Sequence, residues 1–139
     1  MMGERLAAQG MNPDLLVSSP AIRAFETAMV IAGKVGYPTE SIEKDERLYL
    51  AGIQDWFEVI RTLPEDALHV FCFGHNPGLT HLYNIFSPDP VENIPTCGVY
   101  DLGFDVDSWA QLAMSKPESI GYDFPKNRGM EKIEQQAPC

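Results

Sequence analysis

The chain has 139 residues, which is the size of one domain and enough to bury a substantial hydrophobic core. Ten basic residues stand against twenty acidic ones, and the formal net charge of −10 provides no positive field for nucleic acid or anionic lipid. The three cysteines form no CxxC pair, which supports neither a disulfide framework nor a cysteine zinc site, and no apolar run is long enough for a membrane helix. We therefore expect a cytoplasmic protein that binds neither nucleic acid nor membrane.

The first half of the chain alternates helical and extended patterns. Residues 2–10 predict the last turns of a helix that ends at Gly10 but has no N-cap residue before it. Residues 14–17 predict a buried strand. A helix over residues 20–35 should follow, with Ile22, Phe25, Met29 and Ala32 on its apolar face and Gly36 as its cap. Residues 41–49 predict an edge strand or an irregular segment.

The second half continues the alternation. Residues 55–63 predict an amphipathic helix, residues 67–73 a strand buried on both faces, and residues 77–86 a further helix. Tyr100, Leu102 and Phe104 alternate like a strand, residues 105–108 predict a turn, and residues 109–114 predict the returning strand. This order favours one α/β domain over residues 1–126 with a terminal hairpin, followed by a weakly ordered polar tail at 127–139.

Two junctions have the same construction. Ser19 and Asn76 each stand between a predicted strand and a proline that begins a helix, and both are suitable N-cap residues. If the strands are parallel, both helix N-termini lie at the carboxyl edge of the sheet, where open α/β folds bind ligands. The sequence therefore predicts an anion-binding edge.

Two side chains at these junctions could act on a phosphate. Arg23 projects from the first turn of its helix and could bind phosphate bidentately, unless it is only solvated or paired with a carboxylate such as Glu26. His75 follows the most apolar strand, although a single histidine at a strand end is more often structural.

The remaining motifs are less informative. His69 and His81 lie six residues on either side of His75, a spacing that does not match zinc ligands, so no metal site is expected. Cys72 fits an inert core residue better than a nucleophile. No nucleophile elbow, dinucleotide-binding loop or P-loop motif is present.

The segments LLVSSPAIRAFETA and VFCFGHNPGL resemble the histidine phosphatase superfamily, and specifically its SixA-like phosphohistidine phosphatases. The resemblance runs from about residue 2 to residue 126. It implies a phosphoglycerate mutase-like fold, a three-layer α/β/α domain with a mostly parallel sheet. It also implies transfer of a phosphoryl group to a histidine, then hydrolysis, without metal or cofactor. Arg23 would bind phosphate oxygens and His75 would stabilise the transferring group, with Ser19, Asn76 and Thr96 around the pocket.

One part of the family pattern is absent. The family's nucleophilic histidine and first arginine lie in an Arg-His motif after an N-terminal strand, and this chain has no Arg-His dipeptide. The resemblance implies that this central strand is missing, which would leave the edge of residues 68–73 unpaired. Dimerisation through that edge, or inward movement of the hairpin, would close the gap. We expect the chain itself to be inactive.

Three functional readings follow. The first is a phosphohistidine phosphatase that is active only in a longer form, acting on a phosphohistidine-bearing protein. The same family also includes mutases and phosphatases of sugar phosphates and other small phosphoesters. The second is a non-catalytic module that binds phosphate or a phosphoprotein. The third is a remnant of the fold without any ligand.

Overall fold

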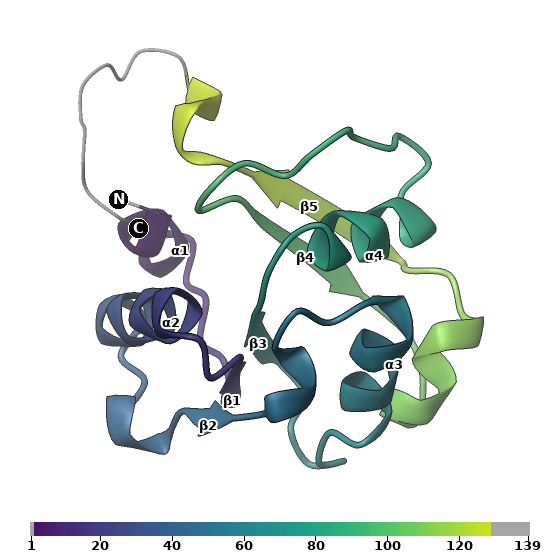
Figure 1. The fold of residues 1–139 in the computed structure, drawn as a ribbon, viewed down its shortest axis with the longest axis horizontal. Helices are drawn as coiled ribbons and strands as arrows, with labels where there is room; N and C mark the ends of the chain where they lie inside the picture. The colour runs from purple at the N-terminus through teal and green to yellow at the C-terminus, as the bar shows by residue number, and fades with distance from the viewer. Residues whose placement is uncertain (1, 129–139) are drawn as a thin grey trace.

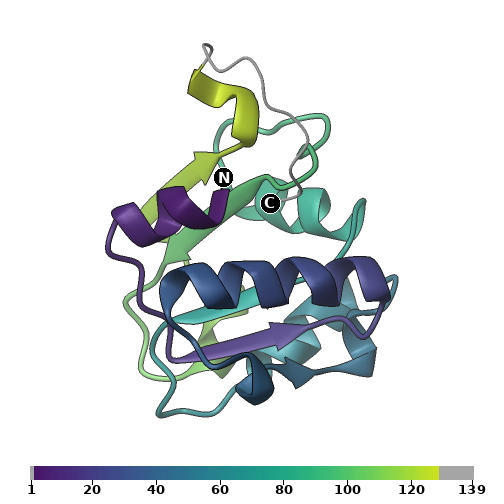
Figure 2. The same cartoon turned by 90° about the vertical axis from the view of Figure 1, so that its left-hand side faces the viewer.

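The computed structural model describes residues 2–128 (Figures 1 and 2). The helices are α1 (Met2–Ala8), α2 (Ile22–Val35), α3 (Ile53–Arg61) and α4 (Gly78–Phe86). The strands are β1 (Leu15–Ser18), β2 (Glu43–Lys44), β3 (Val70–Phe73), β4 (Val99–Gly103) and β5 (Ser119–Asp123). Short 3₁₀ helices are η1 (Thr39–Ser41), η2 (Glu46–Leu48), η3 (Trp109–Met114) and η4 (Pro125–Arg128). The mixed α/β fold expected from the sequence is confirmed, and no helix in this range is both long and apolar enough to cross a membrane.

The strands form two separate sheets. β1 lies between β2 and β3 in a three-stranded parallel sheet, in which Ser18 is opposite Phe73. β4 and β5 form an antiparallel pair, in which Val99 is opposite Asp123. No strand pairing joins β3 to β4 within residues 2–128. The edge of β3 is therefore unpaired on the side away from β1, as expected for residues 68–73. That a strand is missing there stays a prediction.

Helices cover both faces of the parallel sheet. Figures 1 and 2 show α1 and α2 on one face and α3 and α4 on the other. On the first face, Met2, Leu6 and Ile31 form a small core against which alternate residues of β3 pack. A larger core on the opposite face gathers side chains from β1, α3 and α4 around Trp56 and Leu82. This division gives the two-layered hydrophobic packing typical of an α/β domain.

The hairpin is fixed to the rest of the domain at both of its ends. The Arg5 guanidinium donates a hydrogen bond to the Asp123 carboxylate at 3.0 Å and two more to backbone carbonyls just after β5. At the other end, Trp109 Nε1 donates to the carbonyls of Pro64 at 3.1 Å and Ala67 at 3.0 Å. These contacts, which we call the two anchors, place β4 opposite β3 without backbone pairing between them.

Two sequence-based expectations about elements were wrong. Residues 109–114 form η3 instead of the returning strand, because Leu112 is buried and Trp109 is held by its indole hydrogen bonds. The strand that returns to β4 is β5. In α2 the buried positions are Ala24, Ala28, Ile31 and Ala32, whereas Ile22 and Met29 are exposed. Small alanines face the sheet because they allow the helix to approach closely.

β3 is also less buried than expected. Each of its four residues is half-buried, whereas all four residues of β1 are buried. The apolar run predicted a strand covered on both faces, and helices do cover both faces. The exposure arises at the unpaired edge, which the sequence pattern of a single strand does not show. The predicted tail at 127–139 begins within η4, and residues 129–139 lie outside the described residues.

Candidate functional site

The two strand-to-helix junctions meet at one edge of the sheet. Because β1 and β3 are parallel and end opposite each other, the residues that follow them are neighbours. Ser19 Oγ lies 2.8 Å from His75 Nε2, and the Ser19 N–H donates to the carbonyl of Phe73 at 2.9 Å. The structure therefore brings together two of the residues that the sequence singled out.

Ser19 positions His75 instead of capping a helix. The helix begins at Ile22 with Ala21 as its N-cap, so the predicted cap at Ser19 was wrong. Ser19 is fully buried, and its hydroxyl oxygen accepts a hydrogen bond from the Ala21 N–H at 3.2 Å. Because of this turn, the helix begins two residues later than predicted, and the Ser19 hydroxyl faces the His75 imidazole. Orienting a histidine through one ring nitrogen leaves the other free to act.

Asn76 ties the second junction to a later segment. Its side-chain oxygen accepts from the Thr80 N–H at 3.2 Å and from the Thr80 hydroxyl at 2.7 Å, which satisfies donors in the first turn of α4. Its amide group donates to the carbonyl of Ile94 at 2.8 Å, and the Ile94 N–H donates to Thr80 Oγ1 at 3.0 Å. This network fixes the segment that carries Thr96 beside α4. Thr96 itself is exposed.

Two glycines pack the His75 loop against a buried tryptophan. A Cβ atom on Gly74 would lie 2.5 Å from the Trp56 ring, and one on Gly78 would collide with the carbonyl oxygen of Ala51. Trp56 is only 2% exposed, and its indole Nε1 has no hydrogen-bond partner in the described part of the chain. The amphipathic helix predicted over residues 55–63 contains Trp56, but nothing local in the sequence indicates its contact with this loop.

Tyr49 is a site residue that sequence analysis did not single out. Its ring meets the His75 ring edge-on, with 6.1 Å between the centroids and an interplanar angle of 83°, and the side chain is 54% exposed. Just before it, Arg47 forms an ion pair with Asp45 at 2.7 Å and a hydrogen bond to Thr62 at 3.1 Å. The hydrogen bonds from Arg47 hold the pKa of the Asp45 carboxyl below its ordinary value. Tyr49 follows this ion-paired turn and lies beside His75.

Arg23 is available for a ligand. It lies exposed in the first turn of α2, and among residues 2–128 its guanidinium has no ion pair or hydrogen bond with another side chain. The pairing with Glu26, which was the simpler alternative, does not occur. Arg23 lines the same cavity as His75, Asn76 and Thr96.

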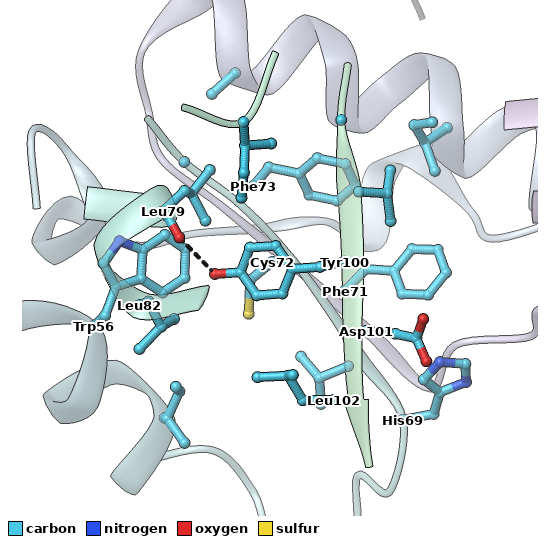
Figure 3. A pocket seen from close by; sticks show the side chains of 18 of the residues that line it. Trp56, His69, Phe71, Cys72, Phe73, Leu79, Leu82, Tyr100, Asp101 and Leu102 are labelled. Carbon is cyan, nitrogen blue, oxygen red and sulfur yellow. Dashed lines mark hydrogen bonds between the residues drawn. The ribbon is translucent and has the colours of Figure 1, made fainter. Parts of the chain in front are cut away.

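That cavity extends from the His75 loop between the two sheets. Its volume is about 1390 Å³, and β3 and β4 form two of its walls (Figure 3). Tyr100 of β4 reaches across it and donates from its hydroxyl to the carbonyl of Leu79 at 3.0 Å. Burial raises the pKa of the Tyr100 phenol, and it raises the pKa of the Cys72 thiol to about 12. The Cys72 side chain packs against the core around Trp56 and Leu82. With its pKa raised by burial, the thiol is unsuited to nucleophilic attack.

Other expected and unexpected features can be placed briefly. Cys72 is a free thiol, whereas Cys97 is disulfide-bonded. Within residues 2–128, no group of three or more histidine, cysteine or acidic side chains could hold a metal ion.

No family model matches this sequence, and no curated protein matches it by sequence. A solved structure with a similar fold is that of the putative phosphohistidine phosphatase SixA from Nakamurella multipartitia. The superposition has a TM-score of 0.68 at 20% sequence identity, and it covers 88% of this chain and 77% of the other. The fold is SixA-like. At this identity the likeness concerns the SixA-like fold alone and assigns no activity.

Proposed function

We propose that this chain carries the phosphate-binding half of a phosphohistidine phosphatase. The observation that carries the proposal is the 2.8 Å contact between Ser19 and His75, which joins two helix-forming junctions at the carboxyl edge of parallel strands. Arg23 lines the same cavity, and its guanidinium forms no ion pair with the carboxylates of residues 2–128. A planar guanidinium and an oriented imidazole together suit the three oxygens of a transferring phosphoryl group. The SixA-like fold supports this chemical class.

The roles of these residues follow from the chemistry of phosphoryl transfer. The transferring group carries negative charge that is spread over its oxygens, so catalysis depends mainly on positioning and on stabilising that charge. Arg23 would bind two phosphate oxygens, and His75, oriented by Ser19, would donate a hydrogen bond to a third. Asn76 and Thr96 would border the pocket. The nucleophilic histidine and a further arginine would come from an Arg-His segment that these 139 residues do not contain.

The preferred substrate is a phosphohistidine on another protein. The segment between β2 and α3, residues 45–52, is too short to cover a small substrate, which leaves the site open to a protein surface. A phosphoramidate leaving group needs little help from a general acid, so the reaction places few demands on the site beyond phosphate binding. A small phosphoester remains the alternative within the same chemistry.

The test compares this chain with a version extended upstream to include an Arg-His motif, using phosphohistidine and an aryl phosphate as substrates. Activity is expected only in the extended form. Within that form, Arg23→Ala and His75→Ala should each lower kcat/KM by about 10²-fold or more. Arg61→Ala and His81→Ala serve as matched controls, because both side chains are exposed and neither lines the cavity. Activity of the short chain itself would mean that another residue is the nucleophile and would contradict the proposal.

A binding module is the second candidate, and one observation favours it: Arg23 and His75 are in place although this chain lacks the nucleophile. In that case the 139-residue chain should bind tungstate or vanadate, and Arg23→Ala should abolish the binding. Equal binding by the Arg23→Ala and Arg61→Ala variants would exclude a specific oxyanion site at these residues.

A further inference from the structure

Two large apolar side chains are exposed at the turn that contacts His75. Tyr49 and Leu50 lie between η2 and α3, and they are 54% and 70% exposed. The Tyr49 ring meets the His75 ring edge-on. Neither residue lines the cavity that His75 and Arg23 line, so both present their side chains on the surface outside it. We call Tyr49 and Leu50 the exposed pair.

The exposed pair is held between two buried residues. Leu48 and Ala51, which flank it in the sequence, both belong to the core beneath α3 and α4. Directly after them, the Gly52 N–H donates to the Asp55 carboxylate at 3.0 Å and so fixes the start of α3. The backbone of the exposed pair is therefore fixed at both ends, and its side chains are displayed at defined positions.

Leu50 adopts a backbone conformation that leucine rarely takes. Its φ angle is 52°, in the left-handed region that favours glycine and asparagine. Its side chain is mostly exposed, so core packing does not require a leucine at this position. Strained residues of this kind cluster at active sites and ligand clamps. A bulky apolar side chain in a strained backbone beside the site points to a contact that the free protein does not show.

The partner in that contact must be apolar and must carry little negative charge. The chain has a formal net charge of −10, and the exposed Glu46 near the pair forms no ion pair within residues 2–128. An acidic segment would therefore be repelled. Because the pair lies outside the cavity that His75 lines, a substrate with its phosphoryl group at His75 would meet the pair with the residues next to its phosphohistidine. A small phosphoester has no such residues.

We propose that the exposed pair selects the protein substrate by contacting an apolar side chain directly next to its phosphohistidine. The inference rests on the proposed phosphatase function and narrows its substrate class to phosphohistidine segments with apolar, non-acidic flanks. Arg23 and His75 act on the phosphoryl group, whereas Tyr49 and Leu50 supply apolar contact area for the segment that carries it.

The test measures kcat/KM on two peptides for the form that is extended upstream to include an Arg-His motif. Each peptide carries one phosphohistidine, which is flanked by leucines in one peptide and by serines in the other. The value of kcat/KM should be about tenfold higher for the leucine peptide. In Leu50→Asn the ratio of the two values should fall toward one, because asparagine removes the apolar surface and adopts the left-handed conformation readily.

Two further variants complete the test. Leu50→Gly should lower the ratio in the same way, because glycine takes a positive φ angle without strain. Met114→Asn is the matched control and should keep the ratio of the unmodified protein. Met114 is 89% exposed on η3, and Trp109 of η3 binds carbonyls that precede β3, whereas His75 follows the end of that strand. Far-UV circular dichroism would show that each variant is folded.

The results that would overturn the inference can be told apart from failure of the proposed function. Equal kcat/KM values for the two peptides would show that the exposed pair does not select the substrate. A preference for leucine that both Leu50 variants retain would show the same, and either result leaves the phosphatase proposal intact. Absence of hydrolysis of both peptides would contradict the proposed function and this inference together.

Discussion

Substitution of the glycine at the start of α4 tests how closely the His75 loop is packed. A Cβ atom on Gly78 would collide with the backbone carbonyl oxygen of Ala51 and would lie 3.2 Å from Trp56 Nε1. A backbone oxygen cannot rotate away as a side chain can, so Gly78→Ala must shift either the loop or the helix. Forcing extra atoms into a packed region typically costs about 1 to 3 kcal/mol. For a domain of this size that corresponds to a decrease in Tm of about 3 to 12 °C.

Gly33→Ala is the matched control for this prediction. Gly33 lies within α2, and no atom lies within 4 Å of the position that its Cβ would occupy. The same chemical change should therefore stabilise the protein by about 0.5 to 1 kcal/mol, because alanine loses less backbone entropy in a helix. Unfolding by urea, followed by far-UV circular dichroism, would measure both variants. If Gly78→Ala were as stable as the unmodified chain, the close packing around His75 would be refuted.

Three further predictions concern other parts of the fold. Asp14→Ala removes the carboxylate that accepts the N–H groups of Leu68 and His69 at 2.9 and 3.0 Å, and urea unfolding should show a loss of about 1 to 2 kcal/mol. Arg5→Ala removes one anchor, so hydrogen exchange should become faster in β4 and β5 than in β1; an equal increase in all three strands would contradict a local role. The Cys72 thiol, with its pKa raised to about 12 by burial, should react with iodoacetamide much more slowly than an unfolded cysteine at mildly alkaline pH, as mass spectrometry would show. Because the pKa of Cys72 is higher in the folded than in the unfolded protein, the buried neutral thiol contributes to the free energy of unfolding. That contribution is fully present below about pH 9 and should be lost as the pH rises toward 12.

The place of the candidate site could be predicted from the direction of the two strands that lead to it. Once the segments ending at Ser18 and Phe73 were taken as parallel strands, the meeting of Ser19 with His75 followed from topology. The exposure and availability of Arg23 could not be derived in this way, because they depend on the absence of a partner in three dimensions. The edge at which the two junctions meet was thus predictable as a location but not as a set of contacts.

The incorrect and incomplete predictions have physical causes that a single sequence does not reveal. Large apolar residues such as Ile22 and Met29 suggested the wrong buried face of α2, because Ala24 and Ala28 permit a closer approach to the sheet. The roles of Tyr49 and Trp56 depend on segments more than fifteen residues away, and no local pattern encodes such contacts. The half-buried state of β3 likewise depends on its neighbours in the sheet, because within residues 2–128 it pairs with β1 on one side only.

The two anchors have a mechanical consequence. Register places them at opposite ends of the hairpin, since the Arg5 contacts adjoin the Val99–Asp123 pair and Trp109 follows the Gly103–Ser119 pair. Between these ends no backbone hydrogen bond fixes β4 to β3 in the described residues. We therefore expect the softest collective motion to be a rotation of the hairpin about the line that joins the anchors, on the microsecond to millisecond timescale typical of hinged segments. Such a rotation would widen or narrow the cavity between β3 and β4 while both anchors stay intact, so the domain could open locally without unfolding globally.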